Sequence, residues 1–321
     1  MSYISFKEGL QVKLEPLGLI PDQVHVFEER QTDAINAALA AGRPLLIRGE
    51  PGTGKSQLAR AAAQRLKRAY IQYVVDSQTE SRDLLWHLDS ITRLAEAQIA
   101  GALANNSKAD RLTKIREELR IENFLEPGPL WWAFDWESAS RQAMRSRSRQ
   151  PQQPHGADPS NGCVLLIDEL DKAETEVPNG LLDALGSGQI ALPSGEVVSA
   201  RSPTPLVIIT TNEERALPDA FIRRCLVLVL KLPENDDALI ELLMMRGAAH
   251  FPDAAASVCR TAAEMLADDR RIARSIDRRA LPGQAEYLDL LRAVLTFHDD
   301  TASQIGALRQ VAEYTLKKHE I

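Results

Sequence analysis

Five apolar runs recur along the first two thirds of the chain, and segments with helical periodicity separate several of them. The runs lie in "RPLLIRG", "AYIQYVVD", "CVLLIDE", "PLVIITTN" and "CLVLVL". Continuous apolar runs of this length are typical of strands that are covered on both faces of a sheet. Because strands and helical segments alternate, the pattern predicts an α/β fold with a parallel five-stranded sheet.

The pattern changes after "KLPEND". From Asp236 onward the apolar residues follow a helical period, with breaks at "FP", "LPG" and "HDD". Four helices fit between these breaks. We therefore expect two domains, an α/β domain at residues 1–232 and a small all-α domain at residues 233–321.

Two segments are longer than simple connections between these strands require. The first, at about residues 82–160, contains Trp86, Trp131, Trp132 and Trp136. These tryptophans either pack in the core or form a contact surface. The end of this insert, "RQAMRSRSRQPQQPHGADPSNG", predicts a mobile loop that is either a solvated linker or a contact to nucleic acid. Its arginines are Arg141, Arg145, Arg147 and Arg149. The second insert, at residues 187–200, predicts a β-hairpin.

A complete phosphate-binding motif, "GEPGTGKS", lies between the first strand and the helix that follows it. Its glycines allow backbone N–H groups to surround a chain of phosphates, and the helix N-terminus adds positive potential. Lys55 can reach the β- and γ-phosphates, and the Ser56 hydroxyl can bind Mg²⁺. The predicted phosphate-binding residues are Gly49, Pro51, Gly52, Thr53, Gly54, Lys55 and Ser56. The alternative is a glycine-rich turn without a ligand.

Two acidic residues, Asp168 and Glu169, end the run "CVLLIDE". In α/β folds, ligands bind where the carboxyl ends of the parallel strands meet. We expect Asp168 to bind Mg²⁺ and Glu169 to orient and deprotonate the attacking water. The alternative is an acidic helix N-terminus that the helix dipole stabilises.

Polar residues also flank the last two runs. Asn212 follows "PLVIITT", where its amide can bond a γ-phosphate or position the water, or can equally end the strand in a turn. Arg223 and Arg224 directly precede "CLVLVL" and need an anionic partner or open water. From the residues alone, Arg223 could instead pair with Asp219 one helical turn earlier.

This ordered set of motifs resembles the AAA+ ATPases. The chain carries, in order, strand–GEPGTGKS–helix, LLIDE, TTN after a strand, and DAFIRRC. The segments "FLEPGPLWWAF" and "LPDAFIRRC" further resemble the MoxR branch of that family. The resemblance implies an enzyme that hydrolyses ATP with Mg²⁺, and a helical lid domain after the fifth strand.

The resemblance also implies a homo-oligomeric ring, a hexamer, in which the nucleotide lies between subunits. It places Arg223 or Arg224 at the γ-phosphate of the neighbouring subunit, where an arginine would neutralise charge that develops on the phosphoryl oxygens. It implies that ATP hydrolysis remodels or activates a separate client or adaptor protein, which in this family often carries a von Willebrand factor A domain.

One more cation is expected in the lid. Related chains carry Lys or Arg before a proline at this point, whereas here Ala280 and Leu281 precede Pro282. Arg278 and Arg279 lie just upstream, and of these we expect Arg279 to reach the nucleotide. The alternative is a solvated basic helix end.

Composition narrows the partners. The chain has 321 residues with 38 Lys+Arg against 45 Asp+Glu, and its net charge of −7 disfavours nucleic acid as a partner. The three cysteines lack the spacing of a metal site and fit a reducing cytosol. The N-terminus lacks the pattern of a signal peptide, and no apolar stretch is long enough for a membrane span. We expect a cytoplasmic protein without membrane contact.

Two other functions are compatible with the same motifs. A nucleic-acid-directed motor would show turnover that DNA stimulates in a salt-sensitive way, but the acidic net charge disfavours it. A nucleotide-gated scaffold would bind ATP without releasing phosphate. The presence of Glu169 and of the arginine pair disfavours that function.

Overall fold

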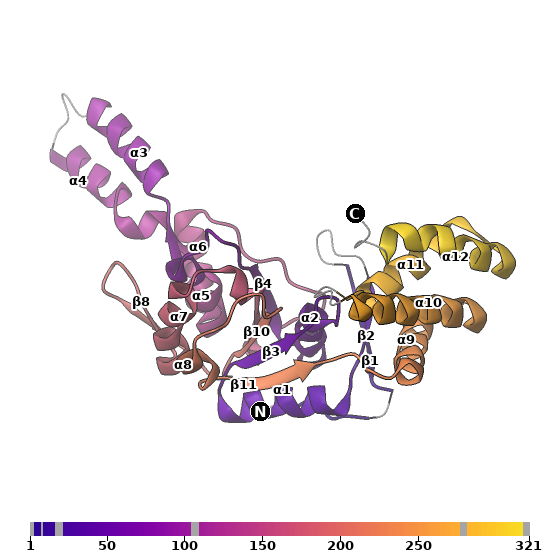
Figure 1. Ribbon diagram of the computed structural model, residues 1–321. Helices are drawn as coiled ribbons and strands as arrows, with labels where there is room; N and C mark the ends of the chain where they lie inside the picture. The colour runs from indigo at the N-terminus through magenta and orange to yellow at the C-terminus, as the bar shows by residue number, and fades with distance from the viewer. Residues whose placement is uncertain (1–2, 8, 17–21, 104–108, 277–280, 317–321) are drawn as a thin grey trace.

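A parallel five-stranded sheet lies at the centre of the computed structural model, which describes residues 3–7, 9–16, 22–103, 109–276 and 281–316 (Figure 1). The strand order is β11-β3-β10-β7-β4, and every neighbouring pair is parallel. The strands are β3 (Leu45–Gly49), β4 (Ala69–Val74), β7 (Cys163–Asp168), β10 (Leu206–Thr211) and β11 (Leu226–Leu230). These are the five apolar runs, so the predicted α/β fold is confirmed.

Helices cover both faces of this sheet, which is why its strands are mostly apolar. Successive side chains of a strand point to opposite faces. Leu45 and Ile47 therefore pack in one core, with α1 (Glu29–Ala41) and α2 (Lys55–Leu66). Leu46, between them, packs in the other core, to which the helices α5 (Pro129–Phe134), α6 (Trp136–Ser146) and α7 (Glu176–Ser187) contribute.

Within the first insert a small antiparallel pair forms, β5 (Trp86–Leu88) and β6 (Leu125–Pro127). Between them, α3 (Ser90–Leu103) and α4 (Ala109–Glu118) project from the sheet domain on the side opposite the C-terminal helices (Figure 1). The short 3₁₀ helices are η1 (Ser81–Leu84), η2 (Ile121–Phe124), η3 (Pro159–Asn161) and η4 (Leu170–Lys172).

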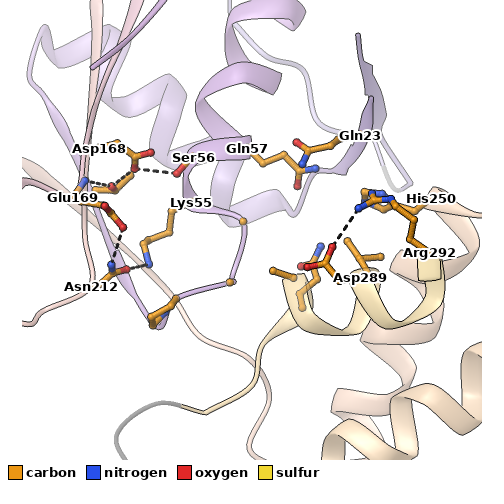
Figure 2. A pocket seen from close by; sticks show the side chains of 17 residues that line it. Gln23, Lys55, Ser56, Gln57, Asp168, Glu169, Asn212, His250, Asp289 and Arg292 are labelled. Carbon is orange, nitrogen blue, oxygen red and sulfur yellow. Dashed lines mark hydrogen bonds and ion pairs between the residues drawn. The ribbon is translucent and has the colours of Figure 1, made fainter. Parts of the chain in front are cut away.

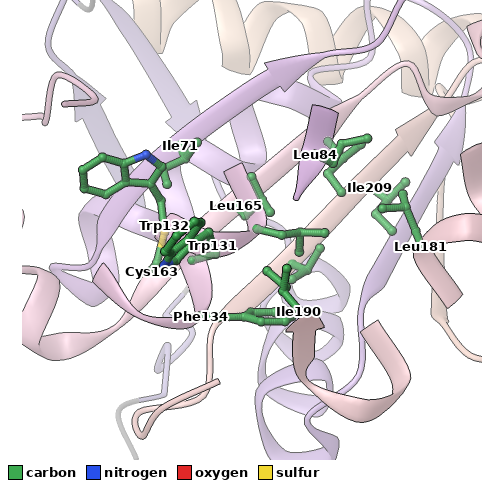
Figure 3. Close-up of a cluster of buried hydrophobic side chains, with 14 of the residues drawn as sticks. Ile71, Leu84, Trp131, Trp132, Phe134, Cys163, Leu165, Leu181, Ile190 and Ile209 are labelled. Atoms are coloured by element: carbon green, nitrogen blue, oxygen red, sulfur yellow. The ribbon is translucent and has the colours of Figure 1, made fainter. Parts of the chain in front are cut away.

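The tryptophans of this insert belong to the core. Trp131 and Trp132 are buried against the sheet (Figure 3), and Trp86 and Trp136 pack partly buried against the same cluster. Trp132 and Trp136 meet edge to face with ring centroids 4.9 Å apart. Of the two roles expected for these residues, core packing is the one confirmed.

The predicted mobile loop is wrong over its first part, because α6 continues through Arg141 to Ser146. Asp135 caps the helix by accepting a hydrogen bond from the backbone N–H of Ser138, and Glu137 pairs with Arg141 at 2.5 Å one turn later. Buried alanines on the opposite side anchor the helix in the core. The hairpin predicted in the second insert is confirmed as β8 (Gln189–Ala191) and β9 (Val197–Ser199).

An N-terminal antiparallel hairpin, β1 (Gln11–Leu14) and β2 (Gln23–Val26), was not expected from the apolar pattern. Its strands are short, and only alternate residues are buried in β1. In Figure 1 the hairpin lies between the sheet domain and the C-terminal helices.

Among the residues that the structure describes, four helices follow β11, as expected, and share a hydrophobic core that is separate from the two sheet cores. They are α9 (Asp236–His250), α10 (Ala256–Ser275), α11 (Gln284–Phe297) and α12 (Thr301–Thr315). We call this group the lid helices. A single helical turn, α8 (Asp219–Ile222), precedes β11. None of the helices within the described ranges combines the length and the apolar character that a membrane span requires.

Candidate nucleotide-binding site

The phosphate-binding motif forms a loop between the end of β3 and the start of α2. Gly52 and Gly54 have φ values of 74° and 89°, in the left-handed region where glycine is favoured. Gly49 is required for a different reason, since a Cβ at this position would lie 2.1 Å from the carbonyl oxygen of Leu230. The loop therefore delivers the N-terminus of α2, with its free N–H groups, to the edge of the sheet.

Lys55 closes the loop from inside. Its Nζ donates hydrogen bonds to the carbonyl oxygens of Gly49 at 2.7 Å and Glu50 at 2.9 Å, and to Oδ1 of Asn212 at 2.7 Å (Figure 2). Burial lowers the pKa of Lys55, and the nearby carboxylates, first of all Asp168, oppose this shift. The ammonium group is thus already aligned by three acceptors.

Asp168 lies beside Ser56, as the sequence predicts. Its Oδ1 accepts hydrogen bonds from Ser56 Oγ at 2.9 Å and from Thr210 Oγ1 at 2.5 Å. Its Oδ2 accepts one from Gln72 Nε2 at 3.2 Å. The Asp168 carboxylate and the Ser56 hydroxyl are oxygen donors at adjacent positions, which is the ligand type that Mg²⁺ prefers.

Glu169 follows in an unusual conformation, with φ of 60° in the left-handed region. Its backbone N–H donates to Thr210 Oγ1 at 2.9 Å, which stabilises this turn. One carboxylate oxygen lies 2.5 Å from Lys172 Nζ, and the other accepts a hydrogen bond from Asn212 Nδ2 at 3.4 Å. Non-glycine residues with positive φ cluster at functional sites, because the surrounding structure must offset the strain.

Asn212 is held in place by a buried carboxylate that was not predicted. Asp171, 2% exposed, accepts a hydrogen bond from the backbone N–H of Asn212 at 3.2 Å and one from that of Glu214 at 2.9 Å. The Asn212 amide then bridges Lys55 and Glu169. The loop after β10 is therefore attached to the acidic end of β7.

These residues line one cavity of about 300 Å³, which extends from the phosphate loop to the lid helices (Figure 2). The predicted residues on its wall are Pro51, Gly52, Gly54, Lys55, Ser56, Asp168, Glu169 and Asn212. The other side is formed by Gln23 and Gln57 together with residues of α9 and α11. Sequence patterns alone predicted one edge of this cavity but not the lid edge.

The predicted lid cation, Arg279, lies outside the described residues. Arg292 of α11 lines the cavity and pairs with Asp289 at 3.2 Å. It lies four residues after Leu288, which also lines the cavity, so both side chains are on the same face of α11.

Arg223 and Arg224 are not in this cavity. Both are exposed, and they line a separate hollow of about 490 Å³ together with Arg43. Arg43 donates hydrogen bonds to the backbone carbonyl oxygens of both residues, the one to Arg224 at 3.0 Å. Within the described part of the chain neither arginine forms an ion pair, so the alternative pair between Asp219 and Arg223 is absent.

The parallel sheet, the phosphate loop and the acidic strand end together define a P-loop nucleoside-triphosphate-binding protein. A sequence model of the AAA domain, dynein-related subfamily, matches residues 44–225, which is more than half of the chain. The chain therefore belongs to this family of AAA+ ATPases.

Two solved structures with similar folds are a point mutant of RuvB from Thermotoga maritima and an inferred ATPase from Cytophaga hutchinsonii. The RuvB match has 17% sequence identity and a TM-score of 0.44, and covers 89% of this chain and 69% of that one. The second match has 12% identity and a TM-score of 0.38, and covers 82% and 57% respectively. No curated protein sequence matches this chain.

Proposed function

We propose that this chain is a MoxR-like AAA+ ATPase that hydrolyses ATP with Mg²⁺ at the subunit interfaces of a ring. The observation that carries the proposal is the convergence of Lys55, Ser56, Asp168, Glu169 and Asn212 at one cavity beside the phosphate loop. In this proposal residues 1–232 form the nucleotide-binding domain and residues 233–321 the lid domain.

The residues present suit a magnesium ion. Ser56 and Asp168 would hold it, because their oxygens are hydrogen-bonded at 2.9 Å on the side of the cavity that faces Lys55. Within the described residues no group of three or more His, Cys, Asp or Glu is placed to form an all-protein metal site. Bound with ATP, the ion would neutralise charge on the β- and γ-phosphates.

The chain's own residues divide the remaining work. Lys55 would release its three present acceptors and bind the phosphates. Glu169, which pairs with Lys172 at 2.5 Å, would accept the proton of the attacking water, and Asn212, which is hydrogen-bonded to Glu169, would position that water. Arg292 would be the lid cation that reaches the nucleotide, the role expected for Arg279.

Arg223 and Arg224 support the ring. They are exposed, form no ion pair with any residue that the structure describes, and lie in a hollow that shares no residue with the nucleotide cavity, which favours a site on another molecule. An arginine supplied across an interface is generally worth roughly 10³–10⁵ in rate. We propose a hexamer whose activity remodels a separate client or adaptor, with a von Willebrand factor A domain as one form of that partner.

Mixing subunits tests this proposal. An Arg223→Ala/Arg224→Ala variant keeps Lys55 and Glu169, whereas Glu169→Gln keeps both arginines. We expect each variant to bind ATP, to be inactive alone, and to regain part of the ATPase activity when the two share a ring. Different fluorescent labels on the two variants must first prove that mixed rings form. Mixed rings without activity, from an arginine variant that also loses ATP affinity as a monomer, would show that the pair acts within its own subunit.

A further inference from the structure

The lid helices contact the phosphate loop itself. Arg270 of α10 is 1% exposed, and its Nη2 forms an ion pair with the carboxylate of Glu50 at 2.8 Å. Its Nη1 donates a hydrogen bond to the carbonyl oxygen of Pro282 at 2.6 Å, just before α11. One buried guanidinium thus connects two parts of the lid to the second residue of the motif "GEPGTGKS".

The start of α11 contacts the next two residues of the loop. The backbone N–H of Ala285 donates to the carbonyl oxygen of Gly52 at 3.2 Å. A Cβ at Gly283 would lie 2.9 Å from the carbonyl oxygen of Pro51, so the backbones approach as closely as glycine allows. The lid therefore touches three successive residues, 50–52, and does so through one ion pair and one backbone contact surface.

Glu50, whose side chain pairs with Arg270 of the lid, also binds Lys55 through its backbone carbonyl oxygen. The carbonyl oxygen of Glu50 accepts hydrogen bonds from Lys55 Nζ at 2.9 Å and from Thr53 Oγ1 at 2.9 Å. A displacement of Glu50 therefore moves the acceptors that define the curve of the loop. The N–H groups that would surround the phosphates belong to the same short segment.

We infer that Arg270 is a positioning residue for nucleotide binding, and that through Glu50 it holds the phosphate loop in the shape that binds phosphate groups. The placement of the lid then sets the affinity of the site for nucleotide. This inference rests on the proposed function, since it takes a nucleotide as the ligand of the cavity.

A second ion pair between the lid and the sheet domain provides a matched control. Arg246 of α9 pairs with Glu28 at 2.7 Å. The side chains of Arg246 and Glu28 are 9% and 38% exposed, close to the 1% and 37% of Arg270 and Glu50. Glu28 is the N-cap of α1 and lies outside the phosphate loop. Loss of this pair weakens the attachment of the lid without removing a contact to the loop.

The experiment compares Glu50→Gln with Glu28→Gln in the full chain, using a fluorescent ADP analogue titrated into each protein. We expect Glu50→Gln to raise the dissociation constant about tenfold, and Glu28→Gln to change it by less than about twofold. The direction of the change in ADP affinity distinguishes electrostatics from loop positioning. Removing a carboxylate near the phosphates would by electrostatics alone tighten binding, whereas loss of loop position weakens it.

Two further measurements separate positioning from a general loss of structure. Glu50→Gln should show a raised KM for ATP with a turnover at saturation within about twofold of the wild type, because chemistry follows binding unchanged. The double variant Glu50→Gln/Arg270→Met leaves no unpaired buried charge, and we expect it to weaken ADP binding as much as Glu50→Gln alone.

Three results would overturn the inference. Tighter or unchanged binding in both variants that lack Glu50 would show that the ion pair does not shape the loop. Equal weakening in Glu28→Gln and Glu50→Gln would assign the effect to lid attachment in general. A wild-type protein that binds neither ATP nor the ADP analogue would refute the proposed function, and this inference with it.

Discussion

Asp171 gives the sharpest test of how the site is built, because its hydrogen bonds to the described residues of the site go to backbone N–H groups. It is buried and accepts hydrogen bonds from the N–H groups of Asn212 and Glu214 at 3.2 and 2.9 Å. Each hydrogen bond to a charged acceptor contributes about 1.5–3 kcal/mol, so Asp171→Ala removes about 3–6 kcal/mol of support for the loop after β10. If half of that free energy is added to the activation barrier because Asn212 is misplaced, turnover falls by about 10–150-fold.

The assay is steady-state ATPase activity together with ATP affinity measured by titration. We expect Asp171→Ala to lose turnover while it still binds ATP, because the phosphate loop keeps its own contacts. Asp171→Asn, which retains one acceptor oxygen, should lie between the two. Asp183→Ala is the control, since Asp183 is an exposed carboxylate on α7. Wild-type turnover in folded Asp171→Ala would refute the idea that this carboxylate positions Asn212.

Three other predictions use simpler changes. Lys55→Ala should abolish ATP binding in a titration, because the loop loses the charge that faces the phosphates. Glu169→Gln should bind ATP with near-normal affinity but release phosphate very slowly; wild-type turnover would exclude its role as the base. Burial holds the pKa of His25 at about 4, below its usual 6.5. The neutral form is thus favoured on folding, and about 3 kcal/mol of stability present above pH 6.5 should be lost between pH 6.5 and 4. Denaturant unfolding of His25→Gln should show a flatter pH dependence.

Local patterns were enough for the sheet and for one edge of the cavity. Apolar runs identify strands covered on both faces, and the glycine spacing of residues 49–56 identifies the phosphate loop, because both signals come from residues adjacent in sequence. Thr210 and Asp171 were not identified. Their roles depend on partners 42 and 41 residues away, Asp168 for Thr210 and Asn212 for Asp171.

The lid residues that line the cavity could not be predicted from the sequence, for a similar reason. Four helices were predictable from their period, but the face that each turns toward the cavity depends on how the lid docks. The docking relies on contacts such as Arg270 with Glu50, which lie 220 positions apart. The end of the first insert was misjudged because its polar composition hides a cap at Asp135 and two buried alanines, Ala139 and Ala143, which make residues 141–146 helical.

Strand β11 connects the arginine pair to the phosphate loop of the same chain. It starts just after Arg223 and Arg224, and its last residue, Leu230, pairs with Gly49 at the entrance to the phosphate loop. Five residues of strand span about 15 Å. Gly49 has no room for a side chain beside Leu230, and the two backbones are paired there. In a ring, each subunit would sense its neighbour's phosphate with one end of this strand and present the other end to its own. In that arrangement a displacement of the arginine pair would reach the phosphate loop of the same chain through the paired strands β11 and β3.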